Sequence, residues 1–412
     1  MRDSKRNDLP LYIVRPQLRA QDASNTALVG RFMENKTSKL AYVDVMRACA
    51  ILMVIVLHTS QVVQGLSMVT VEITAYGQMG VQLFFVVSAY TLCLSHVRRE
   101  GESHPVAKFY TRRFFRIAPL YYIAIAFYFS LHITVQLLQH GPILIYRPYT
   151  AINILANMFF VHGFYPPAND NIVPGGWSIG TEMAFYAIFP ILFRLFHRQY
   201  LKGGVIRLWV LVLVGVTLNI SFQEILILTT KNVIQNNSFN YYSLLNQLPV
   251  FLIGMAVFFT LQSPRSYIFD FHQKMNIIFF VVFTFLSLGL GLGLFWKNIS
   301  GLVPSIIPVL SGISFIFLLE YLRKVTKLPQ LLQRIGQVSY SMYVFHFVFA
   351  WTFSSILNKA LVNALPPGIL LIISIIVTVL LTFYVALISE RLVEKNGIRW
   401  GKYVIQKLDH HF

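Results

Sequence analysis

Charged residues are scarce in this chain, and acidic ones are the scarcest. Of its 412 residues, 12% are charged and 56% are hydrophobic, whereas a soluble domain carries about 25% charged residues. The acidic side chains number 16 against 34 Lys and Arg, which gives a net charge of +18. This composition excludes an ordinary soluble domain and indicates a protein that crosses a membrane several times.

Cysteine and the common catalytic motifs are also nearly absent. The two cysteines, Cys49 and Cys93, lie in apolar segments, and we expect reduced thiols that pack as small apolar residues. The chain has no HExxH, no GxSxG and neither glycine-rich phosphate motif. The sequence therefore predicts no metal site, no α/β-hydrolase serine and no backbone cradle for a nucleotide.

Long hydrophobic runs dominate what is present. Each run of about 20 apolar residues is long enough to cross a bilayer as a helix. We expect an all-α polytopic membrane protein with about ten transmembrane helices. The expected spans are 42–63, 77–96, 117–138, 177–196, 207–228, 244–262, 276–296, 304–322, 337–358 and 367–389. A weaker apolar stretch, 151–163, is too short to cross and is expected to be re-entrant or interfacial.

The positions of Lys and Arg predict the orientation. If the N-terminus is cytoplasmic, the cytoplasmic segments hold 29 of these residues and the outer segments hold four. The outer four are Arg147, Lys231, Lys297 and Lys359. This asymmetry follows the positive-inside rule and places both termini in the cytoplasm. The net charge is thus a signal of topology, and a nucleic-acid partner is not expected.

The chain divides into one membrane domain and two basic tails. Residues 1–40 are polar and basic, without the hydrophobic core or cleavage site of a signal peptide, and are expected to be a cytoplasmic tail. Residues 41–390 form the membrane domain. Residues 391–412 form a basic amphipathic tail, which we expect on the inner membrane surface. We expect no fused soluble domain.

The first span carries three ionisable side chains in an apolar run. Asp44 and Arg47 are three residues apart and can pair on one helix face. Arg47 and His58 are 11 residues apart, which is three turns plus roughly 20°, so they share a face about 16 Å apart. Charges inside a membrane are costly and usually functional. We interpret His58 as a proton carrier or base; the alternative is an ion pair that orients the helix end, with a histidine that bridges helices.

Three arginines stand among aromatic residues in FYTRRFFRIAPLYY at the start of the third span. Arg112 and Arg116 are four residues apart, and Arg113 flanks them. The cluster is equally consistent with a simple positive-inside signal and with a site for a ligand that bears phosphate and adenine. Guanidinium groups bind phosphate through paired hydrogen bonds and stack on aromatic rings.

Two further segments place polar groups inside spans. GGWSIGTE brings Ser178 and Glu182 four residues apart, and a glutamate in a span indicates a functional site unless it only pairs with a buried arginine. SYSMYVFH carries Ser339, Tyr343 and His346 on adjacent faces of the ninth span. Such a histidine can also be only a hydrogen bond between helices.

These segments, in this order, resemble the acyltransferase 3 family of bacterial integral-membrane O-acyltransferases. The resemblance rests on Arg-x10-His in the first span, introduced by Asp44, and on FFVVSAY, RFFRIAPLY, WSIGTE followed by FP, and SYSMYVFH. It runs from about Tyr42 to Glu394. Ala89 replaces the usual glycine of the second motif, and Asn396 replaces a common proline near the end.

The resemblance implies a donor, an acceptor and a location. The donor is cytoplasmic acyl-CoA, most often acetyl-CoA, used as a co-substrate, and no metal is needed. The acceptor is a hydroxyl of a surface glycan or a lipid-linked saccharide, such as O-antigen or exopolysaccharide. The membrane is the bacterial inner membrane.

The resemblance also implies roles for individual residues. The phosphates of CoA would be held by Arg113, Arg116, Arg112 and Arg47. His58 would deprotonate the acceptor hydroxyl or help to move the acyl group. Arg47 would face the cytoplasmic donor, and Glu182 would orient the acceptor or tune His58. The supporting residues would be Asp44, Ser88, Trp177, Ser178, Tyr343 and His346.

Three other functions fit parts of the pattern. A secondary transporter or exporter of an amphiphilic substrate would also have ten spans with charges inside them. A non-catalytic assembly factor for glycan export would use the charges only to dock helices. An acyltransferase for an amine, a small molecule or a lipid would keep the donor site and change the acceptor. The longest outer loop, 139–176, is expected to form part of an acceptor mouth.

Overall fold

The computed structural model describes residues 40–138, 149–230, 238–263, 271–292 and 303–411. The predicted basic tail at 1–40, together with Arg147, Lys231 and Lys297, lies almost wholly outside these ranges. Within them the regular structure is helical and contains no strand, so the predicted all-α class is confirmed.

Nine helical segments of the described residues are long and apolar enough to cross a membrane. One of them, α7 (Gly176–Thr230), is too long for a single crossing and is divided by Gly203 and Gly204. Gly204 has a φ of 66°, a left-handed conformation that glycine adopts without steric cost. The two legs contain the predicted spans 177–196 and 207–228, so the prediction of about ten transmembrane helices is confirmed.

The remaining elements follow the predicted order. They are α2 (Ala41–Ser60), α3 (Met68–Ala75), α4 (Gly80–Val97), α5 (Pro105–Leu138), α6 (Ala151–Met158), α8 (Phe239–Tyr242), α9 (Leu244–Gln262), α10 (Gln273–Gly291), α11 (Val303–Arg323), α12 (Gln330–Gln337), α13 (Ser339–Phe347), α14 (Ser354–Leu361), α15 (Pro367–Ser389) and α16 (Lys395–His411).

The short stretch at 151–163 does not cross the bundle. Its helix α6 has eight residues, which is about 12 Å of rise and well short of a hydrocarbon core of about 30 Å. Two short 3-10 turns, His162–Phe164 and Pro166–Ala168, then lead the chain toward the start of α7. This segment therefore contributes to one end of the bundle, as the sequence predicts.

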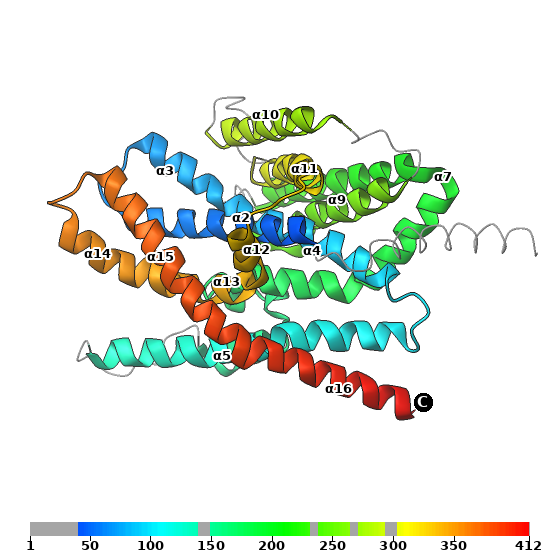
Figure 1. Cartoon of the computed structure of the whole chain (residues 1–412), viewed down its shortest axis with the longest axis horizontal. Helices are drawn as coiled ribbons and strands as arrows, with labels where there is room; N and C mark the ends of the chain where they lie inside the picture. Colours follow the sequence, from blue (N-terminus) through cyan, green and yellow to red (C-terminus); the bar gives the residue numbers. More distant parts are fainter. Residues whose placement is uncertain (1–39, 139–148, 231–237, 264–270, 293–302, 412) are drawn as a thin grey trace, which may run out of the picture.

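Helix α2 lies at the centre of the bundle, against α4, α12, α13 and α15 (Figure 1). Its contact with α12 is very close, because a Cβ atom added at Gly336 would lie 1.7 Å from the carbonyl oxygen of Asp44. Both cysteines are free, as predicted. Asp44, Arg47 and His58 are therefore carried by a helix that other helices surround.

The basic C-terminal tail is a helix that packs against the first half of α5. A five-residue π-helical segment, Glu390–Glu394, joins α15 to α16. Gly397 lies against the backbone of Phe115, and Lys108 pairs with Asp409 at the far end of α16. The tail runs antiparallel to α5, so it extends the bundle as Figure 1 shows.

Candidate functional site

Three cavities follow one another through the bundle, and the first is basic. It has a volume of about 670 Å³ and lies where α4 ends and α5 begins. We call it the basic cavity. It is lined by Arg47, Arg98, Arg99, Arg113 and Arg116, with Asp44 and Gln337 beside them. Five guanidinium groups against one carboxylate indicate a site for a strongly anionic ligand.

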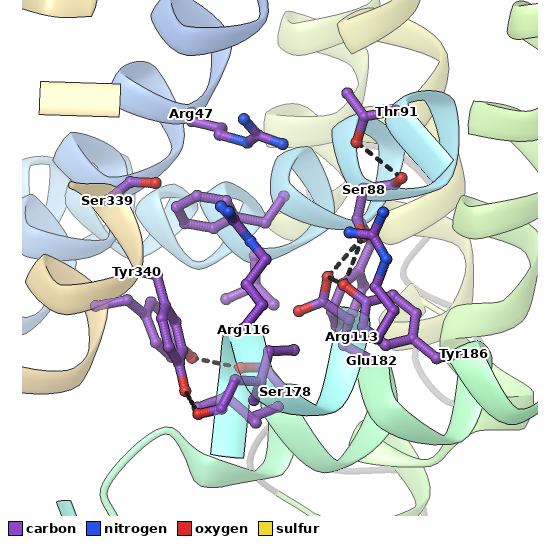
Figure 2. Close-up of a pocket in the computed structure, with 16 residues that line it drawn as sticks. Arg47, Ser88, Thr91, Arg113, Arg116, Ser178, Glu182, Tyr186, Ser339 and Tyr340 are labelled. Carbon is purple, nitrogen blue, oxygen red and sulfur yellow. Dashed lines mark hydrogen bonds between the residues drawn. The ribbon is translucent and has the colours of Figure 1, made fainter. Parts of the chain in front are cut away.

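The second cavity continues from the first and is narrow. It has a volume of about 100 Å³, and it shares Arg47, Arg113 and Arg116 with the basic cavity. We call it the Glu182 cavity, after the carboxylate in its wall. Figure 2 shows Arg47 from α2 and Arg113 and Arg116 from α5 reaching into the same space.

Two of the three shared arginines are held in different ways. Arg47 pairs with Asp44 at 3.6 Å, as predicted from the spacing, and Gln337 donates a hydrogen bond to the same carboxylate at 3.2 Å. Arg113 lies over the rings of Phe109 and Tyr186, at 5.8 and 5.7 Å from their centroids. These contacts orient the guanidinium groups without neutralising all of them.

Two of these arginines have unused hydrogen-bonding capacity. Within the described residues, neither Arg113 nor Arg116 forms an ion pair, and the buried Nε of Arg113 has no hydrogen-bond partner. A buried donor without a partner is uncommon and costs about 1–3 kcal/mol. The arrangement is therefore that of a site that a ligand completes.

Glu182 is held by two hydroxyl groups. Ser88 and Tyr186 both donate hydrogen bonds to its Oε1, each at 2.5 Å. Two hydroxyl groups that donate to one carboxylate oxygen fix the rotamer of the side chain. The other carboxylate oxygen remains directed at the cavity, where the nearby arginines supply positive charge.

The third cavity lies beyond the second and contains His58. It has a volume of about 750 Å³, and it shares Val81 and Tyr343 with the Glu182 cavity. We call it the His58 cavity. Its walls combine flat aromatic rings with amides and one carboxylate: Trp177, Tyr241, Tyr242, Phe347, Trp351, Gln61, Gln78, Asn171 and Asp170. The three cavities therefore adjoin in a row from the basic end of the bundle to His58, with Tyr343 and Val81 in the wall between the second and the third. We call this row the passage.

The hydrogen bonds around His58 determine its tautomer. Trp351 donates its indole N–H to Oε1 of Gln61 at 3.2 Å, and Nδ1 of His58 lies 3.2 Å from the same oxygen. An indole nitrogen can only donate, so the atom it contacts is the amide oxygen. Nδ1 of His58 must therefore also donate. The lone pair of His58 is then on Nε2, the arrangement that a general base requires.

A second histidine lies beside the first. His346 is fully buried, and its ring centroid is 5.3 Å from that of His58. Its Nδ1 donates to the carbonyl oxygen of Tyr343 at 2.7 Å, and its buried Nε2 has no partner. His346 thus supports the wall on which His58 rests.

Tyr343 stands between the second and third cavities. Ser178 donates to its hydroxyl at 2.7 Å, and that hydroxyl donates to the carbonyl oxygen of Gly175 at 3.1 Å. Gly175 has a φ of 73°, and a Cβ atom there would meet the Tyr343 hydroxyl at 2.9 Å. The wall between the second and third cavities is therefore fixed by packing and by paired hydrogen bonds.

Asp170 is the carboxylate of the His58 cavity, and it lies in none of the sequence motifs. Its side chain lines the cavity, near the backbone amides at the start of α7. Desolvation raises the pKa of Asp170 to about 7, although hydrogen bonds from the amides of Trp177, Gly175 and Gly176 act in the opposite direction. Asp170 and His58 thus place two titratable groups in one cavity.

The predicted site residues separate into three groups. Arg47, Arg113, Arg116, Ser88, Ser178 and Glu182 line the Glu182 cavity, with Tyr343 at its far end. His58 and Trp177 line the next cavity, so Glu182 and His58 are neighbours of Tyr343 but have no cavity in common. Arg112 lines neither; it pairs with Glu102 at 2.9 Å. Neighbouring arginines of one helix therefore face different spaces.

Several lining residues had no motif to mark them. Gln61 and Trp351 lie in a turn and in a π-helical segment, Val348–Phe353. Such segments often occur at functional sites. The sequence signal for Asp170 was its position in PPANDN, residues 166–171, within the expected outer loop 139–176. Among the residues that the structure describes, no three His, Cys, Asp or Glu side chains are placed to hold a metal.

Comparison with known proteins identifies the family of the chain. The chain is 26% identical over 187 residues to an uncharacterized protein of Haemophilus influenzae. The aligned region covers 44% of this chain and 75% of that protein. No solved structure matches. Residues 40–387 match the acyltransferase domain family across nearly the whole helical bundle and all three cavities. The chain belongs to the acyltransferase 3 family and is a membrane acyltransferase.

Proposed function

We propose that this membrane acyltransferase moves an acyl group, most simply acetyl, from cytoplasmic acyl-CoA to a hydroxyl of a surface glycan or lipid-linked saccharide. The observation that carries the proposal is the passage from the basic cavity to His58. It joins a polyanion site at one end to a base at the other. The positive-inside rule supports a cytoplasmic basic end, in the bacterial inner membrane.

The basic cavity fits the phosphate end of CoA. Arg47, Arg113 and Arg116 would hold it, and the orphaned Nε of Arg113 is a donor that a phosphate oxygen satisfies. The Glu182 cavity, at about 100 Å³, is too small for a nucleotide, and we assign it to the narrower pantetheine arm. CoA supplies an activated thioester, and the protein supplies the path along which it reaches His58.

His58 has the geometry for deprotonating an acceptor hydroxyl. Gln61 holds the proton on Nδ1, so Nε2 can accept the proton of the attacking hydroxyl. General-base catalysis of this kind contributes about 10²–10⁴-fold to a rate. The departing thiolate of CoA takes up a proton as the ester forms, which balances the reaction.

The walls of the His58 cavity support a sugar as the acceptor. Flat rings such as Trp351, which is 40% exposed, can pack against the apolar face of a pyranose. The amides of Gln78 and Asn171 and the carboxylate of Asp170 offer hydrogen bonds to hydroxyl groups.

The role of Glu182 follows from its place before Tyr343. Its carboxylate faces the arginines of the passage and is fixed by Ser88 and Tyr186. We propose that it orients Arg113 and Arg116 for the donor and acts on His58 only through the intervening wall.

The test is release of CoA from acetyl-CoA by purified protein, with and without a lipid-linked saccharide acceptor. We expect release that is lost in His58→Ala and retained in His272→Asn. The control variant removes an imidazole that caps α10 and keeps a capping side chain. Mass spectrometry of surface glycans would then identify the acylated sugar.

Two outcomes would contradict the proposal. Folded protein that neither binds nor turns over acetyl-CoA, while it moves an amphiphilic substrate across vesicles, would favour a transporter. Turnover with an amine or a lipid, but not with any saccharide, would keep the acyltransferase and reject the glycan acceptor.

A further inference from the structure

A fourth cavity lies beside the basic cavity and is not part of the passage. It has a volume of about 230 Å³ and is enclosed by the end of α4, the turn before α5, the start of α5 and the first leg of α7. We call it the side cavity. Ser95 and Arg99 line both the side cavity and the basic cavity, so the two adjoin.

The side cavity carries an excess of positive charge. Arg99, Arg112 and Arg194 line it, and two carboxylates, Glu100 and Glu102, oppose them. Glu102 pairs with Arg99 at 3.4 Å and with Arg112 at 2.9 Å. Desolvation, and then the charge of Arg112, lower the pKa of Arg99. One carboxylate is therefore shared by two crowded guanidinium groups, which a phosphate dianion would match better.

The same cavity is lined by flat rings. The centroids of His96 and Phe193 lie 4.3 Å apart, and the ring of His197 stacks on Phe193 at 6.1 Å with an interplanar angle of 27°. Phe109 closes the cavity from α5. Aromatic and imidazole faces of this kind bind a planar heterocycle by stacking. Cations and stacking faces in one cavity select a ligand that has both a phosphate and a base.

We propose that the side cavity binds the 3′-phosphoadenosine end of the acyl-CoA donor. This inference rests on the proposed function, and it adds a recognition site that the passage itself does not contain. The diphosphate of the donor would lie in the basic cavity, and its adenine and 3′-phosphate would turn into the adjoining side cavity. Arg112 and Arg194 are then specificity residues for the donor, whereas Arg113 and Arg116 serve the passage.

The first experiment compares the affinity of purified protein for acetyl-CoA and for 3′-dephospho-acetyl-CoA. A charge-assisted hydrogen bond to a phosphate is worth roughly tenfold or more in affinity, so we expect the wild type to prefer acetyl-CoA by at least about that factor. Arg194→Gln should lose most of this preference, as should Arg112→Gln. Arg194 is an exposed side chain, so its replacement leaves the fold intact.

Arg198→Gln is the matched control, because Arg198 is an exposed arginine on the same leg of α7 outside the four cavities. It should keep the full preference. An equal affinity of the wild type for both donors would overturn the inference, as would a preference that survives in Arg112→Gln and Arg194→Gln. If the wild type does not bind acetyl-CoA at all, the proposed function fails as well, so the two failures are distinguishable.

A competition experiment separates the nucleotide from a lipid headgroup. Adenosine 3′,5′-bisphosphate should displace acetyl-CoA from the wild type, and Arg194→Gln should weaken that displacement several-fold. Vesicles of phosphatidylglycerol that displace acetyl-CoA where the bisphosphate does not would assign the side cavity to an anionic lipid and overturn the inference. Glu102→Gln should tighten the binding of acetyl-CoA, but not of its 3′-dephospho form, because it removes the competing carboxylate.

Discussion

Gln61 offers a direct test of how His58 is held, because its amide oxygen accepts from both His58 and Trp351. We predict that Gln61→Met, which keeps the length of the side chain and removes the acceptor, lowers kcat/KM. One neutral hydrogen bond contributes about 0.5–1.5 kcal/mol, which corresponds to roughly a 2- to 12-fold loss. Gln61 is exposed, so the variant should keep its stability.

Lost activity with retained stability would not by itself show that Gln61 acts through His58. The assay is therefore a double-mutant cycle. The rate of CoA release would be measured for the wild type, Gln61→Met, His58→Ala and the double variant. If Gln61 acts through His58, Gln61→Met should have almost no effect once the imidazole is gone. Trp351→Phe, which removes the other donor to the same oxygen, should cost less than Gln61→Met.

Two results would refute this reasoning. Gln61→Met with the activity of the wild type would mean that His58 does not depend on this hydrogen bond. Losses that simply add in the double variant would mean that Gln61 contacts the acceptor rather than His58.

Further predictions concern the donor, the pH dependence and the packing. Arg113→Lys should raise the KM for acetyl-CoA about tenfold with a smaller change in kcat, because lysine lacks the planar donor group. Steady-state kinetics would measure both constants, and an unchanged KM would remove Arg113 from the donor site. Because the pKa of Asp170 is raised to about 7, its contribution to stability is present at low pH and is lost as pH rises through 7. The Tm of the wild type relative to Asp170→Asn should therefore fall between about pH 4 and pH 7; a constant difference would show that Asp170 is not shifted. Gly336→Ala should destabilise the protein by about 1–3 kcal/mol or more, because the new Cβ atom would overlap the backbone of Asp44. Thermal unfolding would measure this loss of stability, and a Tm equal to that of the wild type would show that α2 and α12 can separate.

The helical bundle could be read from the sequence because hydrophobic length and charge position act locally. The apolar run around Arg47 and His58 predicts one helix, and their spacing of 11 residues places them on one face whatever surrounds them. The pairing of Asp44 with Arg47 follows in the same way. The break between the two legs of α7 at Gly203 and Gly204 also has a local cause, since glycine permits the backbone turn.

Which side chains share a cavity could not be read in this way. Arg112 and Arg113 are neighbours in sequence, but successive helical side chains differ by about 100°, so the packing of α4 and α7 around α5 sends one to the side cavity and the other to the passage. Glu182 and His58 were expected to act together, and Tyr343 lies between their cavities.

The sequence by itself determined the helices, their order and the ionisable groups that they carry, because periodicity and hydrophobic length depend on neighbours along the chain. Only the tertiary structure decided that Gln61 and Trp351 orient His58 and that Asp170 shares its cavity. Gln61 is three residues after His58, but Trp351 and Asp170 come from distant segments. Their meeting with His58 depends on how helices pack, which no local pattern records.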